Sequence, residues 1–365
     1  MKIGIITFHR AVNYGAILQA YALQQALNKL GVDNEIIDYR CRHIEDAYSL
    51  FDIKKIKSLR NLIHIVLYDP VNKIKSNKFK KFIEQNIKMS SKIETKNDLN
   101  EINMNYEAFI TGSDQVWNNK CTGFDKAYFL DFVKDDTKKN SYAASFGTNC
   151  IIEELEEDYR KLLGKFNNIS IREKQGQEIL RELINIDVPV HLDPTFLLTK
   201  EEWLNVVKDT SNKDKYILVY LMQYSPSIIK FAENLSKSSG YKIIHINNEI
   251  IKKAKGKYIR TSGPEEFLGL FAGAEYIVTN SFHGTAFSIN FNKNFFVELL
   301  PPPAKVNSRL ENIMDLLNLR DRQIVNGKNI NIDKSIDYNK VNAKIAEERE
   351  VAKSYLREIL GVSNE

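Results

Sequence analysis

The chain has 365 residues and a net charge of +5, with 43% hydrophobic and 27% charged residues. This length favours two domains, and the composition is that of an ordinary soluble globular protein. The mild charge fits an anionic small molecule or a membrane surface as well as nucleic acid, so it selects no partner. Three widely spaced cysteines, Cys41, Cys121 and Cys150, predict free thiols, and no apolar run approaches eighteen residues. We therefore expect a cytoplasmic protein.

The first half of the chain alternates strand-like and helical patterns. A strand over 3–7, a helix over 15–30 ending at Gly31, and a strand over 35–39 form the first unit. Such alternation predicts a parallel sheet covered by helices. The further elements expected in this half are strands at 108–111, 141–146, 169–171 and 188–192, and helices at 153–163 and 173–183.

Residues 51–88 differ from their surroundings because lysines are interspersed among apolar residues. A basic amphipathic segment can lie on an anionic membrane, which would give a peripheral membrane contact. The commoner alternative is a solvated helical face that covers a core. We place this segment in the first domain.

A second alternating series begins after Asp193-Pro194-Thr195, with strands expected at 216–221, 241–246, 276–279 and 294–298. The expected domains are 1–197 on the acceptor side and 198–338 on the donor side. A charged helix within 339–365 is expected to pack back on the first domain. The fold class predicted is α/β and GT-B-like, with two Rossmann-like domains whose parallel sheets face each other across a cleft.

Several common sites are missing from the sequence. There is no GxGxxG after the first strand, no P-loop, no HExxH, no cysteine–histidine zinc spacing and no GxSxG elbow. These absences argue against dinucleotide, P-loop and zinc chemistry, and aromatic-plus-basic patches typical of RNA-binding proteins are not evident. We expect neither a metal nor a nucleic-acid partner.

Polar residues follow several predicted strands, where open α/β sheets bind ligands. After the first strand, His9, Arg10, Asn13 and Tyr14 offer groups that could bind sugar hydroxyls, although a capped surface loop is an equal alternative. After the strand at 108–111, Asp114 could be a base or a helix cap. Trp117 could stack on a sugar ring.

Two further strand ends carry charged or titratable groups. Arg172 presents a planar fork that suits a phosphate or carboxylate, or it forms a surface ion pair with Glu173 or Glu178. After the strand at 276–279 the chain turns at His283-Gly284 and resumes as a helix from 285 to 290. That order places an imidazole and a helix N-terminus together and favours an anion, unless His283 merely caps the helix. Arg309 opens a later helix.

Taken together, these segments resemble the polysaccharide pyruvyl transferase family. Each is weak alone, but the resemblance runs through most of the chain in one order. The segments are Asn13-Tyr14-Gly15, Gly112-Ser113-Asp114-Gln115-Val116-Trp117, Tyr142-Ala143-Ala144-Ser145-Phe146-Gly147, Ile171-Arg172-Glu173, His191-Leu192-Asp193-Pro194-Thr195 and Ser281-Phe282-His283-Gly284-Thr285, followed by Arg309.

The resemblance implies transfer of pyruvate from phosphoenolpyruvate to two hydroxyls of a sugar, which forms a cyclic ketal and releases phosphate. The resemblance implies no cofactor, and phosphoenolpyruvate would be a co-substrate. The acceptor would be an exopolysaccharide, capsule or cell-wall precursor, linked to a lipid or nucleotide and modified inside the cell, with the inner membrane face as one location. Arg172, Arg309, Ser281, Gly284 and Thr285 would bind the donor.

The resemblance also suggests the remaining roles. His283 would be the acid, because the ordinary pKa of histidine, about 6.5, lies near working pH; phosphate binding is its alternative role. Many members carry Asp where Ala16 stands and Arg where Ser281 stands. We therefore assign the base to Asp114 or His9, and acceptor binding to Arg10, Asn13, Tyr14 and Trp117.

Two other functions fit the same fold. One is a GT-B glycosyltransferase that uses a nucleotide sugar, for which Pro264-Glu265-Glu266 at a helix start would belong to the nucleoside pocket. The other is a non-catalytic protein of glycan assembly, which Ser281 and Ala16 favour somewhat. Phosphate release from phosphoenolpyruvate, compared with nucleotide release from nucleotide sugars, separates all three.

Overall fold

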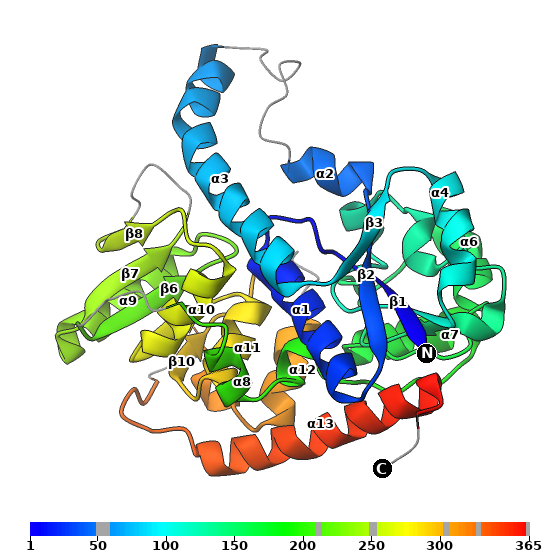
Figure 1. Cartoon of the computed structure of the whole chain (residues 1–365). Coiled ribbons are helices and arrows are strands. Elements are labelled where there is room, and N and C mark those ends of the chain that lie inside the picture. Colours follow the sequence, from blue (N-terminus) through cyan, green and yellow to red (C-terminus); the bar gives the residue numbers. More distant parts are fainter. Residues whose placement is uncertain (49–58, 209–213, 248–253, 302–306, 326–329, 363–365) are drawn as a thin grey trace. The chain divides into compact units, whose positions relative to one another are not determined.

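The computed structural model describes residues 1–48, 59–208, 214–247, 254–301, 307–325 and 330–362. The start of the predicted basic segment, residues 51–58, lies outside the described residues. The described chain contains two five-stranded sheets in which every pair of neighbouring strands is parallel. Figure 1 follows the alternation of strands and helices along the chain.

The first sheet has the order β3-β2-β1-β4-β5, with β1 (Lys2–Ile6) at its centre. Ile3, Ile5 and Ile6 are all buried, as expected for a parallel strand that is covered on both faces. The other strands are β2 (Asp33–Tyr39), β3 (Met89–Ile93), β4 (Ala108–Thr111) and β5 (Lys139–Ser141).

Helix α1 (Tyr14–Lys29) connects β1 to β2 and begins at a side-chain cap. The Asn13 side chain accepts a hydrogen bond from the Ala16 N–H, and Gly31 follows the helix at φ 73°. The remaining helices of this half are α2 (Arg42–Tyr48), α4 (Lys96–Glu101), α5 (Asn119–Thr122), α6 (Glu153–Leu163) and α7 (Lys174–Ile184).

Three strands expected from apolar runs are much shorter in the structure. The run at 141–146 supplies only the end of β5, because Ala143 adopts a left-handed backbone at φ 47° that interrupts the strand. Beyond this point the chain forms single parallel bridges, Ala144 to Ile171 and Ile171 to Val190. The segments predicted as strands at 169–171 and 188–192 therefore form isolated bridges, which continue the sheet beyond β5.

The second sheet has the order β10-β9-β6-β7-β8. Its strands are β6 (Tyr216–Tyr220), β7 (Lys242–Ile246), β8 (Lys257–Ile259), β9 (Tyr276–Thr279) and β10 (Asn294–Val297). Its helices are α8 (Lys200–Leu204), α9 (Pro226–Ser239), α10 (Pro264–Gly273), α11 (Phe282–Asn290) and α12 (Ser308–Leu316).

The chain divides into two compact units, and the division between Leu198 and Thr199 lies one residue from the predicted boundary. The first unit holds residues 1–48 and 83–198 and the chain from 342 onward, and the second holds the described residues of 49–82 and 199–341. Helix α3 (Leu59–Asn86) therefore belongs mostly to the second unit, not to the first domain in which the sequence analysis placed it. Lys78 of this helix forms an ion pair with Glu266 of α10 at 2.6 Å.

The last helix, α13 (Tyr338–Leu360), packs on the first unit from Asn342 onward. Its Arg349 Nε donates to the Phe196 carbonyl at 2.8 Å, and its Tyr355 hydroxyl donates to the Ser141 carbonyl at 2.9 Å. Within the described residues, none of the helices has both the length and the apolar character that crossing a membrane requires.

Candidate functional site

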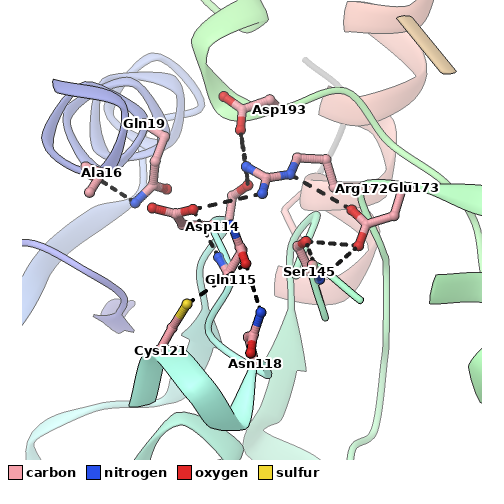
Figure 2. Close-up of polar contacts among 12 residues, drawn as sticks. Ala16, Gln19, Asp114, Gln115, Asn118, Cys121, Ser145, Arg172, Glu173 and Asp193 are labelled. Atoms are coloured by element: carbon pink, nitrogen blue, oxygen red, sulfur yellow. Dashed lines mark hydrogen bonds and ion pairs between the residues drawn. The ribbon is translucent and has the colours of Figure 1, made fainter. Parts of the chain in front are cut away.

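Arg172 stands at the carboxyl edge of the first sheet, and its guanidinium is buried among acidic side chains (Figure 2). Its Nη1 donates to Asp193 Oδ2 at 2.6 Å and to Ser113 Oγ at 3.3 Å. Asp193 is also fully buried, and its other oxygen accepts hydrogen bonds from the N–H and hydroxyl of Thr195. Asp193 is therefore held on both sides and fixes the guanidinium.

Asp114 is the second carboxylate beside this guanidinium, with Oδ1 at 3.7 Å from Arg172 Nη2. Its backbone has φ 76°, in the left-handed region that Asp tolerates better than most residues. The same Oδ1 accepts the Gln115 N–H at 2.9 Å, and the Asp114 side chain is 13% exposed. Asp114 therefore presents a partly exposed carboxylate in a strained, fixed conformation.

Glu173 completes the group of acids, with Oε2 at 3.9 Å from Arg172 Nε. Its Oε1 accepts the Ser145 hydroxyl at 2.7 Å. Burial alone would lower the pKa of Arg172, but Asp193, Asp114 and Glu173 raise it above its ordinary value. One arginine thus faces three carboxylates, so this part of the first unit carries an excess of negative charge when the acids are ionised.

His9 and Arg10 follow β1 and both contact Asp38 at the end of β2. His9 Nε2 lies 3.0 Å from Asp38 Oδ1, and its Nδ1 lies 3.0 Å from the Thr7 carbonyl oxygen. Arg10 binds Asp38 with two hydrogen bonds of 2.8 and 2.6 Å. Burial opposes ionisation of Asp38, but the hydrogen bonds from His9 and Arg10 hold its pKa well below the usual range.

The other predicted acceptor residues are less available. Asn13 is the cap of α1, and Tyr14 is the first, buried residue of that helix. Trp117 is fully buried: its Nε1 donates to the Tyr128 carbonyl and its ring stacks on Phe129. The expectation that Trp117 stacks on a sugar is wrong for this structure, because the ring is fully buried among Phe129, Phe146 and Phe166.

In the second unit, Ser281 is the cap of α11 and accepts the Gly284 N–H at 3.2 Å. The helix therefore begins at Phe282, three residues before the predicted start, and His283 and Gly284 lie in its first turn and not in a loop. Gly284 is required there, since an added Cβ would approach Thr279 Oγ1 to 2.3 Å. The Thr285 hydroxyl donates to the Ser281 carbonyl.

His283 and Arg309 both contact the ring of Phe282 in this unit. The Phe282 and His283 rings are edge to face with centroids 5.1 Å apart, and the Arg309 guanidinium lies over the Phe282 ring at 5.7 Å. Both residues are only 9% exposed. The structure thus gathers an imidazole, a guanidinium and a helix N-terminus at the carboxyl end of β9.

Three contributors were not identified as site residues from the sequence. Asp193 was named only as part of the His191–Thr195 motif. An acidic residue between a predicted strand and Pro194 could have identified it as a site residue. Asp38 closes the second strand and looked like part of its alternating pattern. Phe282 gave no signal, because an aromatic residue beside a histidine is more often a core residue.

Comparisons with known proteins agree with this description. A sequence model of the polysaccharide pyruvyl transferase family matches residues 13–297 of the chain. The match includes Asp114, Arg172 and His283 but not His9, Arg10 or Arg309. No curated protein matches the sequence.

Among solved structures, the chain is similar to two UDP-N-acetylglucosamine 2-epimerases. The Rickettsia bellii enzyme is 11% identical with a TM-score of 0.51, over 99% of this chain and 96% of that one. The Neisseria meningitidis enzyme, solved bound to UDP-GlcNAc, is 10% identical with a TM-score of 0.50, over 99% of both chains. At such identity the similarity shows the fold alone, and it agrees with a GT-B-like pair of parallel-sheet α/β domains.

Proposed function

We propose that this chain, which belongs to the polysaccharide pyruvyl transferase family, transfers pyruvate from phosphoenolpyruvate to two hydroxyls of a sugar in a polysaccharide precursor. The product would be a cyclic ketal, with release of phosphate. The observation that carries this proposal is the cluster of His283, Arg309 and the α11 N-terminus, which suits a small, densely charged anion.

The two candidate sites differ in local charge, and each suits a different substrate. Phosphoenolpyruvate is a trianion when fully ionised, so it is attracted by Arg309 and by the positive end of α11. Around Arg172 three carboxylates outnumber one guanidinium, which disfavours a trianion and suits a neutral polyol whose hydroxyls donate hydrogen bonds. We therefore assign the donor to the second unit and the sugar to the first, and move Arg172 from donor binding to positioning.

The acid in this proposal is His283. Its imidazolium would give a proton to the methylene carbon of phosphoenolpyruvate, which becomes a methyl group and leaves an oxocarbenium-like centre at the enol carbon. The first sugar hydroxyl adds to that carbon, the bond to phosphate breaks, and the second hydroxyl adds in its place. Of the two hydroxyl protons, one balances the proton that the methyl group gained, and the other leaves on the released phosphate. Arg309 would stabilise the departing phosphate.

The base is better assigned to Asp114 than to His9. A base needs an acceptor atom that a substrate hydroxyl can reach, and Asp114 offers a carboxylate that is 13% exposed. Both nitrogens of His9 face acceptor oxygens, and its side chain is only 2% exposed. Asp114 would then replace the family's aspartate at the position of Ala16; Figure 2 draws Ala16 and Asp114 in one close-up.

Donor binding tests this proposal directly. Phosphoenolpyruvate should raise the unfolding temperature of the protein and bind in calorimetry, and the protein should release no nucleotide from UDP-glucose or UDP-N-acetylglucosamine. Arg309→Gln should weaken binding by about ten- to a hundredfold, the worth of a charge-assisted hydrogen bond. Arg320→Gln is the matched control, because Arg320 lies in the same unit but is 40% exposed. His283→Gln should reduce turnover more than donor affinity.

A parent protein that binds a nucleotide sugar and ignores phosphoenolpyruvate would transfer support to the glycosyltransferase alternative. One feature already weighs against that alternative. Glu266, expected to line a nucleoside pocket, accepts the Gly263 N–H at 2.9 Å and pairs with Lys78. Its carboxylate is thus committed to the start of α10 and to α3.

A further inference from the structure

Two arginines and a histidine surround a single carboxylate at the ends of β1 and β2. Asp38 Oδ1 lies 3.0 Å from His9 Nε2, 2.8 Å from Arg10 Nε and 3.1 Å from Arg40 Nε. Its Oδ2 accepts from Arg10 Nη2 at 2.6 Å and from Arg40 Nη2 at 3.2 Å. Asp38 itself is only 6% exposed, so the carboxylate is saturated and buried beneath the two arginines.

Both ring nitrogens of His9 lie against acceptor oxygens. Nδ1 faces the Thr7 carbonyl oxygen and Nε2 faces Asp38 Oδ1, each at 3.0 Å. Without any contribution from His9, Arg10 and Arg40 supply two positive charges against one on Asp38.

The neighbouring groups do not cancel this excess. Glu45 accepts from Arg40 Nη1 at 3.0 Å but is 40% exposed, so solvent screens it, and Lys92 and Glu94 form an ion pair with each other. Burial raises the pKa of the Cys41 thiol to about 11, so that group is neutral. Arg10 and Arg40, at 19% and 24% exposed, form the outer surface of the cluster.

Arg10 lines a small depression, and the cluster lies on the same sheet edge as Asp114. The depression is lined by Phe8, His9, Arg10, Tyr39, Glu45 and Tyr128. The strands run in the order β2, β1, β4, and the Thr7 hydroxyl donates to the Ser113 carbonyl at 2.8 Å, which ties the β1 and β4 loops together. Because neighbouring strands are about 4.8 Å apart, the ends of β2 and β4 are separated by roughly 10 Å.

We propose that Arg10 and Arg40 bind the phosphate or diphosphate that links the acceptor sugar to its carrier. A sugar whose hydroxyls reach Asp114 would place the phosphate at its reducing end toward β1 and β2, where the positive charge is in excess. Asp38 and His9 hold the two guanidinium groups and do not contact the ligand. This inference rests on the proposed function, since it assumes that the acceptor occupies the first unit.

Binding of inorganic pyrophosphate, measured by calorimetry at low ionic strength without phosphoenolpyruvate, tests the subsite. The parent should bind it, and Arg10→Gln and Arg40→Gln should each weaken binding by about ten- to a hundredfold. Arg181→Gln, an exposed arginine of the same unit, is the matched control and should change nothing. Arg309→Gln should retain pyrophosphate binding while losing phosphoenolpyruvate binding, which shows that the two anions use different sites.

The outcomes separate this inference from the proposed function. A parent that binds phosphoenolpyruvate but not pyrophosphate, or whose Arg10 and Arg40 variants bind pyrophosphate unchanged, overturns the subsite alone. If either variant fails to fold, Arg10→Lys and Arg40→Lys retain the charge and should show the same loss to a smaller degree. In turnover, a sugar on uridine diphosphate and the same sugar on a polyprenyl diphosphate distinguish the two carriers; an unphosphorylated sugar used equally well would overturn the proposal.

Discussion

At the scale of single residues, Arg172 shows how burial changes the reading of a charged side chain. A guanidinium after a strand looks like an anion ligand in the sequence, but here it is 1% exposed and paired with Asp193 at 2.6 Å. Removing it would leave buried carboxylates without a counter-charge, which costs about 3–5 kcal/mol in comparable cases. Its role in the fold therefore precedes any role toward a substrate.

We expect Arg172→Gln to lower the free energy of unfolding by roughly that amount, about 3–5 kcal/mol, in urea denaturation. The double variant with Asp193→Asn should recover part of the loss, because one uncompensated charge is removed. Arg181→Gln, at an exposed ion pair, should change the free energy little. A stable Arg172→Gln protein that has lost only phosphoenolpyruvate binding would restore the original donor role.

His191 offers a prediction for pH. It is 5% exposed between the rings of Tyr142 and Tyr355, and burial lowers its pKa to about 4 from 6.5. The unfolded chain therefore binds a proton in the range between these values that the folded chain does not. Stability from this residue is complete above about pH 6.5 and is lost as the pH falls toward 4, by roughly 3 kcal/mol in total.

The measurement is urea denaturation at several pH values, with His191→Phe as the comparison because it keeps an aromatic ring. As the pH falls from 7 to 4, the unfolding free energy of the parent should decrease relative to that of the variant. A gap that stays constant would mean that His191 has the same pKa in the folded and the unfolded chain.

At the scale of elements, the sequence predicted strongly periodic segments well and polar or interrupted ones poorly. Helix α1 lies within one residue of its predicted bounds, because its apolar spacing and Gly31 mark it clearly. Strand β3 (Met89–Ile93) was not predicted, since its sequence is largely polar and half exposed at the sheet edge. The early start of α11 was missed because the cap, Ser281, lies before a histidine and a glycine that resemble a turn.

The candidate site divides in the same way. Residues placed at strand ends by local pattern, such as Asp114 and His283, could be found from the sequence. The pairing of Arg172 with Asp193 and of His9 with Asp38 depends on strand order, which no local pattern contains. Burial of Trp117 likewise depends on aromatic residues distant in sequence.

Helix α3 carries the question of membrane contact. Of its described lysines, Lys78 pairs with Glu266, and burial lowers the pKa of Lys75 to about 8. Lys73 and Lys81 are exposed. We therefore expect weak binding to phosphatidylserine vesicles at low salt. This binding should disappear near 0.15 M salt, because the Debye screening length has then fallen to about 8 Å.

Co-sedimentation of the protein with such vesicles, at low and physiological salt, measures this. Lys73→Glu with Lys81→Glu should abolish the low-salt binding and leave the unfolding temperature unchanged. Binding that persists in both the double variant and high salt would locate the membrane contact elsewhere on the protein.

At the scale of the whole molecule, each compact unit contains one of the two tryptophans. Trp117 is fully buried in the first unit and Trp203 in the second. Variants Trp203→Phe and Trp117→Phe would therefore carry a single fluorophore that reports unfolding of the first or the second unit, respectively. Two units with separate sheets need not unfold in one transition.

If phosphoenolpyruvate binds at His283 and Arg309, it stabilises the second unit by mass action, by about 2.7 kcal/mol at a hundred times its dissociation constant. The Trp203 signal in Trp117→Phe should then shift to higher urea with phosphoenolpyruvate, while the Trp117 signal in Trp203→Phe shifts less. Each variant is compared with itself with and without ligand, so loss of the other tryptophan does not enter. A larger shift at Trp117 would place phosphoenolpyruvate in the first unit and overturn the assignment of the donor to His283 and Arg309.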